Sequence, residues 1–187
     1  LLSQDTFQSE KLKRLVSLVV DRSKVSIRPM NFKNQKQFSL DVHSLKTLYN
    51  AAWEQNWGFV KMTDEEFNFL AADLKQIADP NLVLLAEINN KPIGFSLALP
   101  DVNQCFIHKS GGIIGGVWHL LTKQKKINLA RIIVLGLLPE YRNTGIDAVL
   151  YHETGVRAAK RGIQYGEASW ILEDNEPMKK ALSQTMK

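Results

Sequence analysis

A loop of polar residues and glycine at positions 139–147 has the composition of an anion-binding site. It follows an apolar run at 132–138, which predicts a buried strand. It precedes residues 148–160, whose apolar side chains recur every three or four positions, as in a helix. The first N–H groups of a helix lack partners within it and lie at the positive end of its dipole. This order of elements therefore favours phosphate binding, and Gly145 would let the backbone approach the ligand.

The loop resembles the pyrophosphate loop of the acyl-CoA-dependent N-acyltransferases known as the GNAT superfamily, which reads Arg/Gln-x-x-Gly-x-Gly/Ala. Arg142 and Gly145 match, as do Pro139 and Tyr141 before them, whereas Asp147 stands where the family has glycine or alanine. A carboxylate there would repel a pyrophosphate unless it points away. The helix dipole also favours an aspartate in the first turn without any ligand. Cofactor binding and plain capping of the helix both remain open for this loop.

The elements predicted around the loop have the order of a GNAT domain. The chain begins with a basic amphipathic helix at 9–21, which we expect to pack on the core or on a neighbouring domain. In chain order there follow a strand at 25–28, helices at 38–53 and 63–77, a hairpin at 82–88 and 92–99, a glycine-rich insert, the strand, loop and helix described above, and a strand at 164–172. The resemblance implies an α/β (α+β layered) fold in which helices flank a central mixed sheet.

We expect both ends of the domain to be incomplete. Residues 1–23 are interpreted as a helical appendage or the end of a preceding region, and residues 24–187 as a GNAT-like domain whose last strands are missing. Residues 175–187 read as the beginning of a helix that stops with the chain. Four short runs are similar to those of a poorly characterised bacterial GNAT subgroup, at 49–53, 56–59, 99–103 and 170–175.

The resemblance implies an acyl-CoA as cosubstrate, and acetyl-CoA is the form that we expect. The backbone of Leu135, Leu137 and Leu138 would bind its pantetheine arm, and Asn175 is either a cofactor contact or a helix cap. The pyrophosphate would lie on the backbone N–H groups of the loop, where Arg142 would add a charged contact. The loop positions are Arg142, Asn143, Thr144, Gly145, Ile146, Asp147 and Ala148.

The segment between the second and third predicted helices is rich in large apolar residues. Trp53, Trp57 and Phe59 lie in or beside it, although a solvent-exposed connection would not need such side chains. Two interpretations carry equal weight. The three residues either close the edge of the core or form the wall of the acceptor-substrate pocket, which GNAT enzymes commonly shape with this loop.

Acyl transfer to an amine requires a neutral nucleophile, a polarised thioester carbonyl and an acid for the departing thiolate. Glu173 and Glu167, on or near the last predicted strand, are the candidates for a general base. Family members often carry a tyrosine acid seven residues beyond an asparagine, but counting from Asn175 that position holds Leu182. The sequence therefore predicts an N-acetyltransferase acting on a primary amine of a small molecule or peptide. The alternative is a catalytically inactive CoA-binding or protein-interaction module.

Composition and charge limit the partners, the metals and the cellular location that we expect. The 187 residues carry a net charge of +5 and 44% hydrophobic residues, which suits one globular domain and anionic partners. No base-stacking or groove-helix pattern accompanies the charge, so nucleic acid is not expected as a partner. No apolar run approaches the roughly 20 residues of a membrane span, and no signal peptide opens the chain, so we expect no membrane partner and a cytoplasmic location. Cys105 and the four histidines form no spaced metal motif, so no metal is expected.

Overall fold

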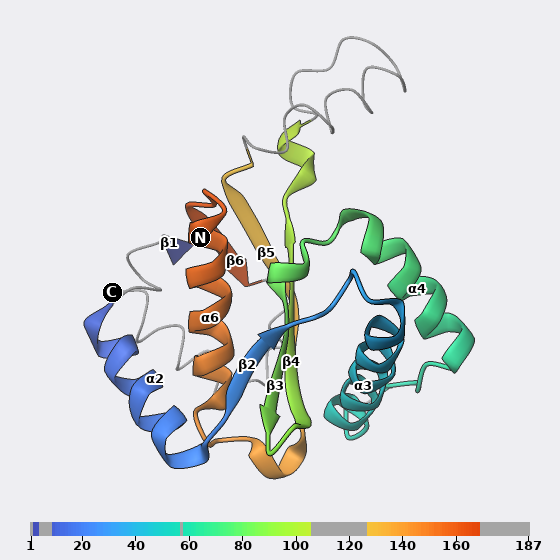
Figure 1. Cartoon of the computed structure of the whole chain (residues 1–187), viewed down its shortest axis with the longest axis horizontal. Helices are drawn as coiled ribbons and strands as arrows, with labels where there is room; N and C mark the ends of the chain where they lie inside the picture. Colours follow the sequence, from blue (N-terminus) through green and yellow to red (C-terminus); the bar gives the residue numbers. More distant parts are fainter. Residues whose placement is uncertain (1, 4–8, 57, 106–126, 169–187) are drawn as a thin grey trace.

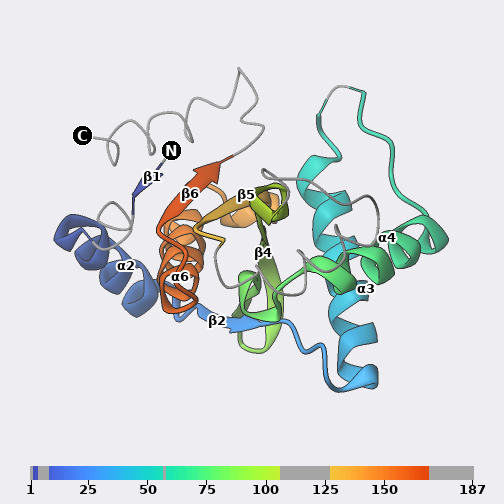
Figure 2. The ribbon, with the colours of Figure 1, turned by 90° about the horizontal axis from the view of Figure 1, so that it is seen from above.

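The computed structural model describes residues 2–3, 9–56, 58–105 and 127–168 as a six-stranded sheet between two layers of helices (Figures 1 and 2). Helices α2 and α6 cover one face, and α3 and α4 lie on the other. The strands are β1 (Leu2–Ser3), β2 (Ser26–Pro29), β3 (Val83–Ile88), β4 (Lys91–Pro100), β5 (Leu129–Leu137) and β6 (Tyr165–Ala168). The helices are α2 (Glu10–Ser23), α3 (Gln35–Trp53), α4 (Asp64–Ile77) and α6 (Ile146–Lys160), with single 3-10 turns η1 (Pro80–Leu82), η2 (Val102–Cys105) and η4 (Pro139–Tyr141).

The strand order is β1-β6-β5-β4-β3-β2, and the sheet is mixed. Strands β2 to β5 pair antiparallel, and β5 and β6 pair parallel. Helix α6 connects these two parallel strands, which confirms the predicted order of strand, glycine loop, helix and strand. Strand β2 does not stop before Pro29 as predicted but includes it. A proline is tolerated there because β2 is an edge strand and needs no N–H on its open side.

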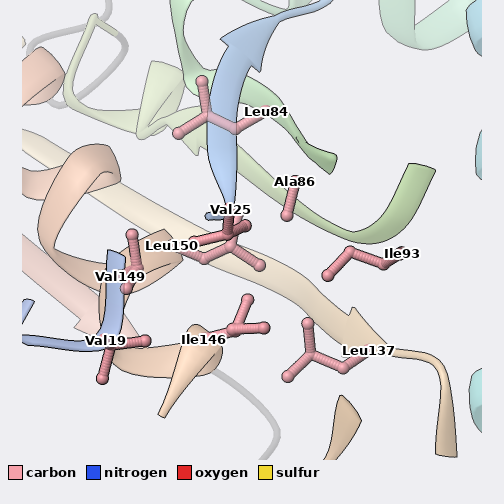
Figure 3. Close-up of a cluster of buried hydrophobic side chains, with 9 residues drawn as sticks. All are labelled: Val19, Val25, Leu84, Ala86, Ile93, Leu137, Ile146, Val149 and Leu150. Atoms are coloured by element: carbon pink, nitrogen blue, oxygen red, sulfur yellow. The ribbon is translucent and has the colours of Figure 1, made fainter. Parts of the chain in front are cut away.

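The main core cluster lies between the sheet and helices α2 and α6 (Figure 3). Its side chains alternate along β3, where Leu84 and Ala86 face α6 while Val83 and Leu85 face α3. All four are at most 3% exposed, so β3 is covered on both faces. The cluster consists of Val19, Val25, Leu84, Ala86, Ile93, Leu137, Ile146, Val149 and Leu150.

Helix α2 packs on the core, which is one of the two positions predicted for it. Leu12 and Val19 are buried, and Val19 belongs to the same cluster as residues of α6 and the sheet. The outward face carries Leu15 and Leu18, which are 45% and 68% exposed. Strand β1 pairs with β6, so the described N-terminal residues share both the sheet and the core. The division of the chain at residue 23 stays a prediction.

Several predictions concern residues outside the described ranges. They include the pocket residue Trp57, the general-base candidate Glu173, the cofactor or cap residue Asn175 and the position of Leu182. The glycine-rich insert also falls there.

Candidate cosubstrate-binding site

The glycine loop begins where β5 ends and has a locally determined shape. The N–H of Leu138 donates to the carbonyl of Ile93 at 2.9 Å, so β5 stays attached to β4 up to the loop. Thr144 Oγ1 donates to the Tyr141 carbonyl at 2.6 Å. Asn143 and Gly145 have φ values of 59° and 88°, and the second of these starts α6 two residues earlier than predicted. The turn thus connects the end of β5 to the beginning of α6.

Helix α6 has no side-chain cap. Its N-cap residue is Gly145, which has no side chain, and Asp147 in the first turn makes no capping hydrogen bond. The N–H groups at the start of the helix therefore have no side-chain acceptor among the described residues, and an anion would supply what a capping serine or aspartate normally supplies. The predicted capping role of Asp147 is not observed, but its charge still lies at the positive end of the helix dipole.

Helix α2 contacts the glycine loop through Arg22 and Val19. Arg22 Nη2 donates to the carbonyl of Thr144 at 2.9 Å. A Cβ at Gly145 would lie 2.8 Å from Cγ2 of Val19, closer than side-chain atoms approach one another. Sequence analysis missed Arg22, because a residue 122 positions from its partner leaves no local signal.

Arg142 is turned toward α3. Its Nη2 donates to the carbonyl of Ala52 at 2.6 Å, in the last turn of that helix. Its expected contact with a phosphate stays a prediction, and the guanidinium already has a protein partner.

One edge of β5 is open beside the loop, within the part of the chain that the structure describes. Strand β6 pairs only with residues 129–132 of β5, whereas β4 pairs with β5 up to Leu137. The pairing of β4 with β5 changes register at this place. Leu97 of β4 pairs with Val134 and Ala98 with Ile132, so Ile133 of β5 is left without a partner residue on β4. An extended ligand with amide groups can pair with such a strand edge. Leu135 and Leu137 lie on this stretch, whereas Leu138 follows it and donates its N–H to Ile93 of β4. The contact of these residues with a pantetheine arm stays a prediction.

Trp53 and Phe59 lie in one aromatic group with Tyr49, on the α3 side of the sheet. The Trp53 and Tyr49 rings stack with centroids 5.0 Å apart, and Phe59 lies 5.7 Å from Tyr49. Trp53 also covers Gly136 of β5, where a Cβ would be 2.6 Å from the indole ring. Both side chains are half-buried, and Trp53 packs against the core cluster of Leu48, Leu85 and Phe95.

The groups available for proton transfer are only partly described. Glu167 of β6 forms an ion pair with Arg131, with 3.0 Å between Oε2 and Nε, and both side chains are partly exposed. Burial raises the pKa of the Tyr151 hydroxyl on α6, so this tyrosine stays protonated at neutral pH. Whether Glu167 acts as a base therefore stays a prediction.

Among the described residues, no group of three or more His, Cys, Asp or Glu side chains is arranged to hold a metal ion. None of the helices so described has the length and apolar composition needed to cross a membrane.

Sequence comparison finds two curated bacterial relatives. Protein YghO of Escherichia coli K12 is 32% identical over an alignment of 181 residues, and the match covers 93% of this chain and 45% of the relative. The bacterial ceramide synthase of Caulobacter vibrioides is 30% identical over an alignment of 152 residues, and the match covers 78% of this chain and 40% of the relative. The chain thus spans less than half the length of either protein. No family model matches it.

Solved structures with a similar fold include acetyltransferases. The aminoglycoside acetyltransferase AAC(6')-Iy, in complex with a bisubstrate analogue of CoA, matches with a TM-score of 0.57 and 13% identity over 86% of this chain and 88% of that one. The ribosomal-protein-S18-alanine N-acetyltransferase of Escherichia coli matches with a TM-score of 0.54 and 11% identity over 86% and 76% of the two chains. Identities this low bear on the fold alone. The chain therefore has the fold of these N-acetyltransferases, which confirms the predicted GNAT fold.

Proposed function

We propose that this domain binds an acyl-CoA and transfers its acyl group to a primary amine. The observation that carries the proposal is the start of α6, which no described side chain caps, next to an edge of β5 that no described strand covers. The first offers N–H donors to a pyrophosphate, and the second offers backbone partners to the amides of a pantetheine arm. The two lie at the same end of the sheet, as one extended cosubstrate requires (Figure 1).

In the proposed reaction, the amine nitrogen attacks the thioester carbonyl carbon. A C–N bond forms and the C–S bond breaks, the amine gives up one proton, and the CoA thiolate takes one up. A backbone N–H of β5 would polarise the carbonyl. Glu173 or Glu167 would receive the amine proton. Glu167 would do so through water, because Arg131 already holds its carboxylate.

The name of one relative suggests which substrates to test. A ceramide is an amide between a fatty acid and a long-chain amino alcohol, so the name of the Caulobacter relative denotes an N-acylation. This relative is 30% identical in sequence to the chain, whereas the acetyltransferases of known structure are less than 20% identical to it. We therefore propose a long-chain acyl-CoA and a long-chain amine as the first pair of substrates to test. The acetyl group and a small-molecule or peptide amine form the second pair.

A release assay for the free thiol of CoA tests the proposal. Full-length protein would be incubated with palmitoyl-CoA or acetyl-CoA and with sphinganine, an aminoglycoside or a peptide with N-terminal alanine. Amine-dependent thiol release, with the amide product found by mass spectrometry, supports the proposal and selects the pair. Folded protein that binds no CoA contradicts it.

The second candidate function is a CoA-binding module without catalysis. Asp147 in the first turn of α6 favours it, because a carboxylate at that place opposes a bound pyrophosphate. Saturable CoA binding without turnover on any amine would support this candidate against the first.

A further inference from the structure

Arg142, the first residue of the glycine motif, stabilises the end of α3. Its 2.6 Å hydrogen bond reaches the carbonyl of Ala52 in the last turn, which contains no basic residue of its own. The last carbonyls of a helix have no partner within it and lie at the negative end of its dipole, so they favour a guanidinium. The bond therefore joins two elements that are 90 residues apart in the sequence.

The residue after Ala52 is Trp53, whose ring lies over the backbone of β5. A Cβ at Gly136 would be 2.6 Å from Cζ3 of the indole and 2.9 Å from Cη2. The ring stacks on Tyr49 and lies 6.2 Å from the Phe95 ring, centroid to centroid. The position of Trp53 relative to β5 therefore depends on where α3 ends.

We propose that Arg142 is a positioning residue that holds Trp53 over β5 and thereby limits the space beside β5 that would hold the acyl chain of the cosubstrate, here called the acyl pocket. The inference rests on the proposed function, which places the thioester along this part of β5. It differs from the role that sequence similarity assigns to Arg142, a direct contact with phosphate. The same loop would bind the pyrophosphate through its N–H groups and locate the pocket wall through this one side chain.

A truncated cosubstrate separates the two roles. Acyl-pantetheine carries the same thioester as acyl-CoA but lacks the nucleotide phosphates. If Arg142 positions Trp53, Arg142→Ala lowers kcat/KM by roughly tenfold with both donors, as expected for loss of a hydrogen bond to a charged group. If Arg142 contacts a phosphate, the loss is confined to acyl-CoA, and the proposal is overturned.

A double variant tests the route through Trp53. Trp53→Ala should broaden the range of acyl-chain lengths used, and adding Arg142→Ala to it should cause little further loss, because both changes affect one interaction. Fully additive losses would contradict the proposal. Arg14→Ala, on the exposed face of α2, removes the same charge at a distance and serves as the control.

Hydrogen exchange provides a measurement that needs no cosubstrate. Without its partner at Ala52, the last turn of α3 should open more readily, so amides at 52–56 exchange roughly tenfold faster in Arg142→Ala than in the wild type. Unchanged exchange would overturn the proposal even if the enzyme is active. Faster exchange in a protein that binds no CoA would refute the proposed function while the tie between Arg142 and α3 remains established.

Discussion

Val19 of helix α2 fills the space into which a side chain on Gly145 would project, with 2.8 Å between its Cγ2 and the position of a Cβ. The sequence suggested that this glycine serves the approach of a ligand. The structure shows that it also serves the approach of a helix. Substitution at Gly145 therefore disturbs the core cluster as well as the loop and is a poor probe of ligand binding.

We predict that Gly145→Ala lowers the free energy of unfolding by about 1 to 3 kcal/mol, because it adds overpacking to a φ of 88° that disfavours alanine. Val19→Ala should relieve the steric part. The double variant should then be less destabilised than the sum of the two single variants in urea unfolding. Additive effects would show that the two side chains do not compete for space.

Gly136→Ala should displace Trp53, because the new methyl group would lie 2.6 Å from the indole. We expect a loss of about 1 to 3 kcal/mol in unfolding free energy, as for other overpacked cores. The same substitution in a Trp53→Leu background should cost less, since the smaller side chain leaves room. Equal costs in the two backgrounds, measured by urea unfolding, would place the strain elsewhere.

A buried ionic cluster fixes β2 to α3. The carboxylate of Asp41 has no exposed surface and accepts two hydrogen bonds from Arg28, at 2.8 and 3.0 Å. The N–H of Asn31 and the side chain of Gln37 also donate to it. Burial by itself would raise the pKa of the Asp41 carboxyl, but these four donors outweigh burial and hold its pKa below the usual value.

Asp41→Asn should therefore lower the unfolding free energy by roughly 3 kcal/mol, at the low end for a broken buried pair because Arg28 is partly exposed. The stabilisation from a lowered pKa is complete above the unfolded-state pKa of about 4 and is lost as the pH falls through the lower folded-state value. In unfolding experiments from pH 6 to pH 2, the variant should thus lose less stability than the wild type. Asp73→Asn, which removes an exposed carboxylate of α4, is the control, and an equal effect there would contradict the assignment.

Local patterns were readable from the sequence. The Thr63-x-x-Glu66 pattern forms both bonds of a capping box. Asn89 and Asn90, in the turn of the predicted hairpin, have the positive φ values that asparagine tolerates in such turns. The strand, glycine loop and helix were also correctly placed. Capping boxes, turns and helix boundaries depend on residues a few positions apart in the sequence. Their spacing alone determines whether these residues come into contact.

The contacts that shape the candidate site were not readable in this way. Arg142 meets Ala52 across 90 residues, and Arg22 meets Thr144 across 122. Periodicity shows which side of α2 is apolar, but it does not show that this side packs against Gly145. Such partners follow from the arrangement of whole elements in space, which a single sequence does not display.

Two single-charge changes at the loop should alter CoA affinity in opposite directions. Asn143 is exposed with a φ of 59°, a conformation that aspartate also tolerates, so Asn143→Asp adds a negative charge with little strain. Asp147→Asn removes one. If a pyrophosphate lies at the start of α6, we expect the first to weaken and the second to strengthen CoA binding, each by about threefold to tenfold. Thermal unfolding would confirm that both variants remain folded.

The most direct test of the central claim is a calorimetric titration of CoA into full-length wild type and these two variants at one salt concentration. The account predicts saturable binding by the wild type, weaker binding by Asn143→Asp and tighter binding by Asp147→Asn. Absence of binding by folded wild type, or a change in the same direction for both variants, would contradict a phosphate site at the start of α6.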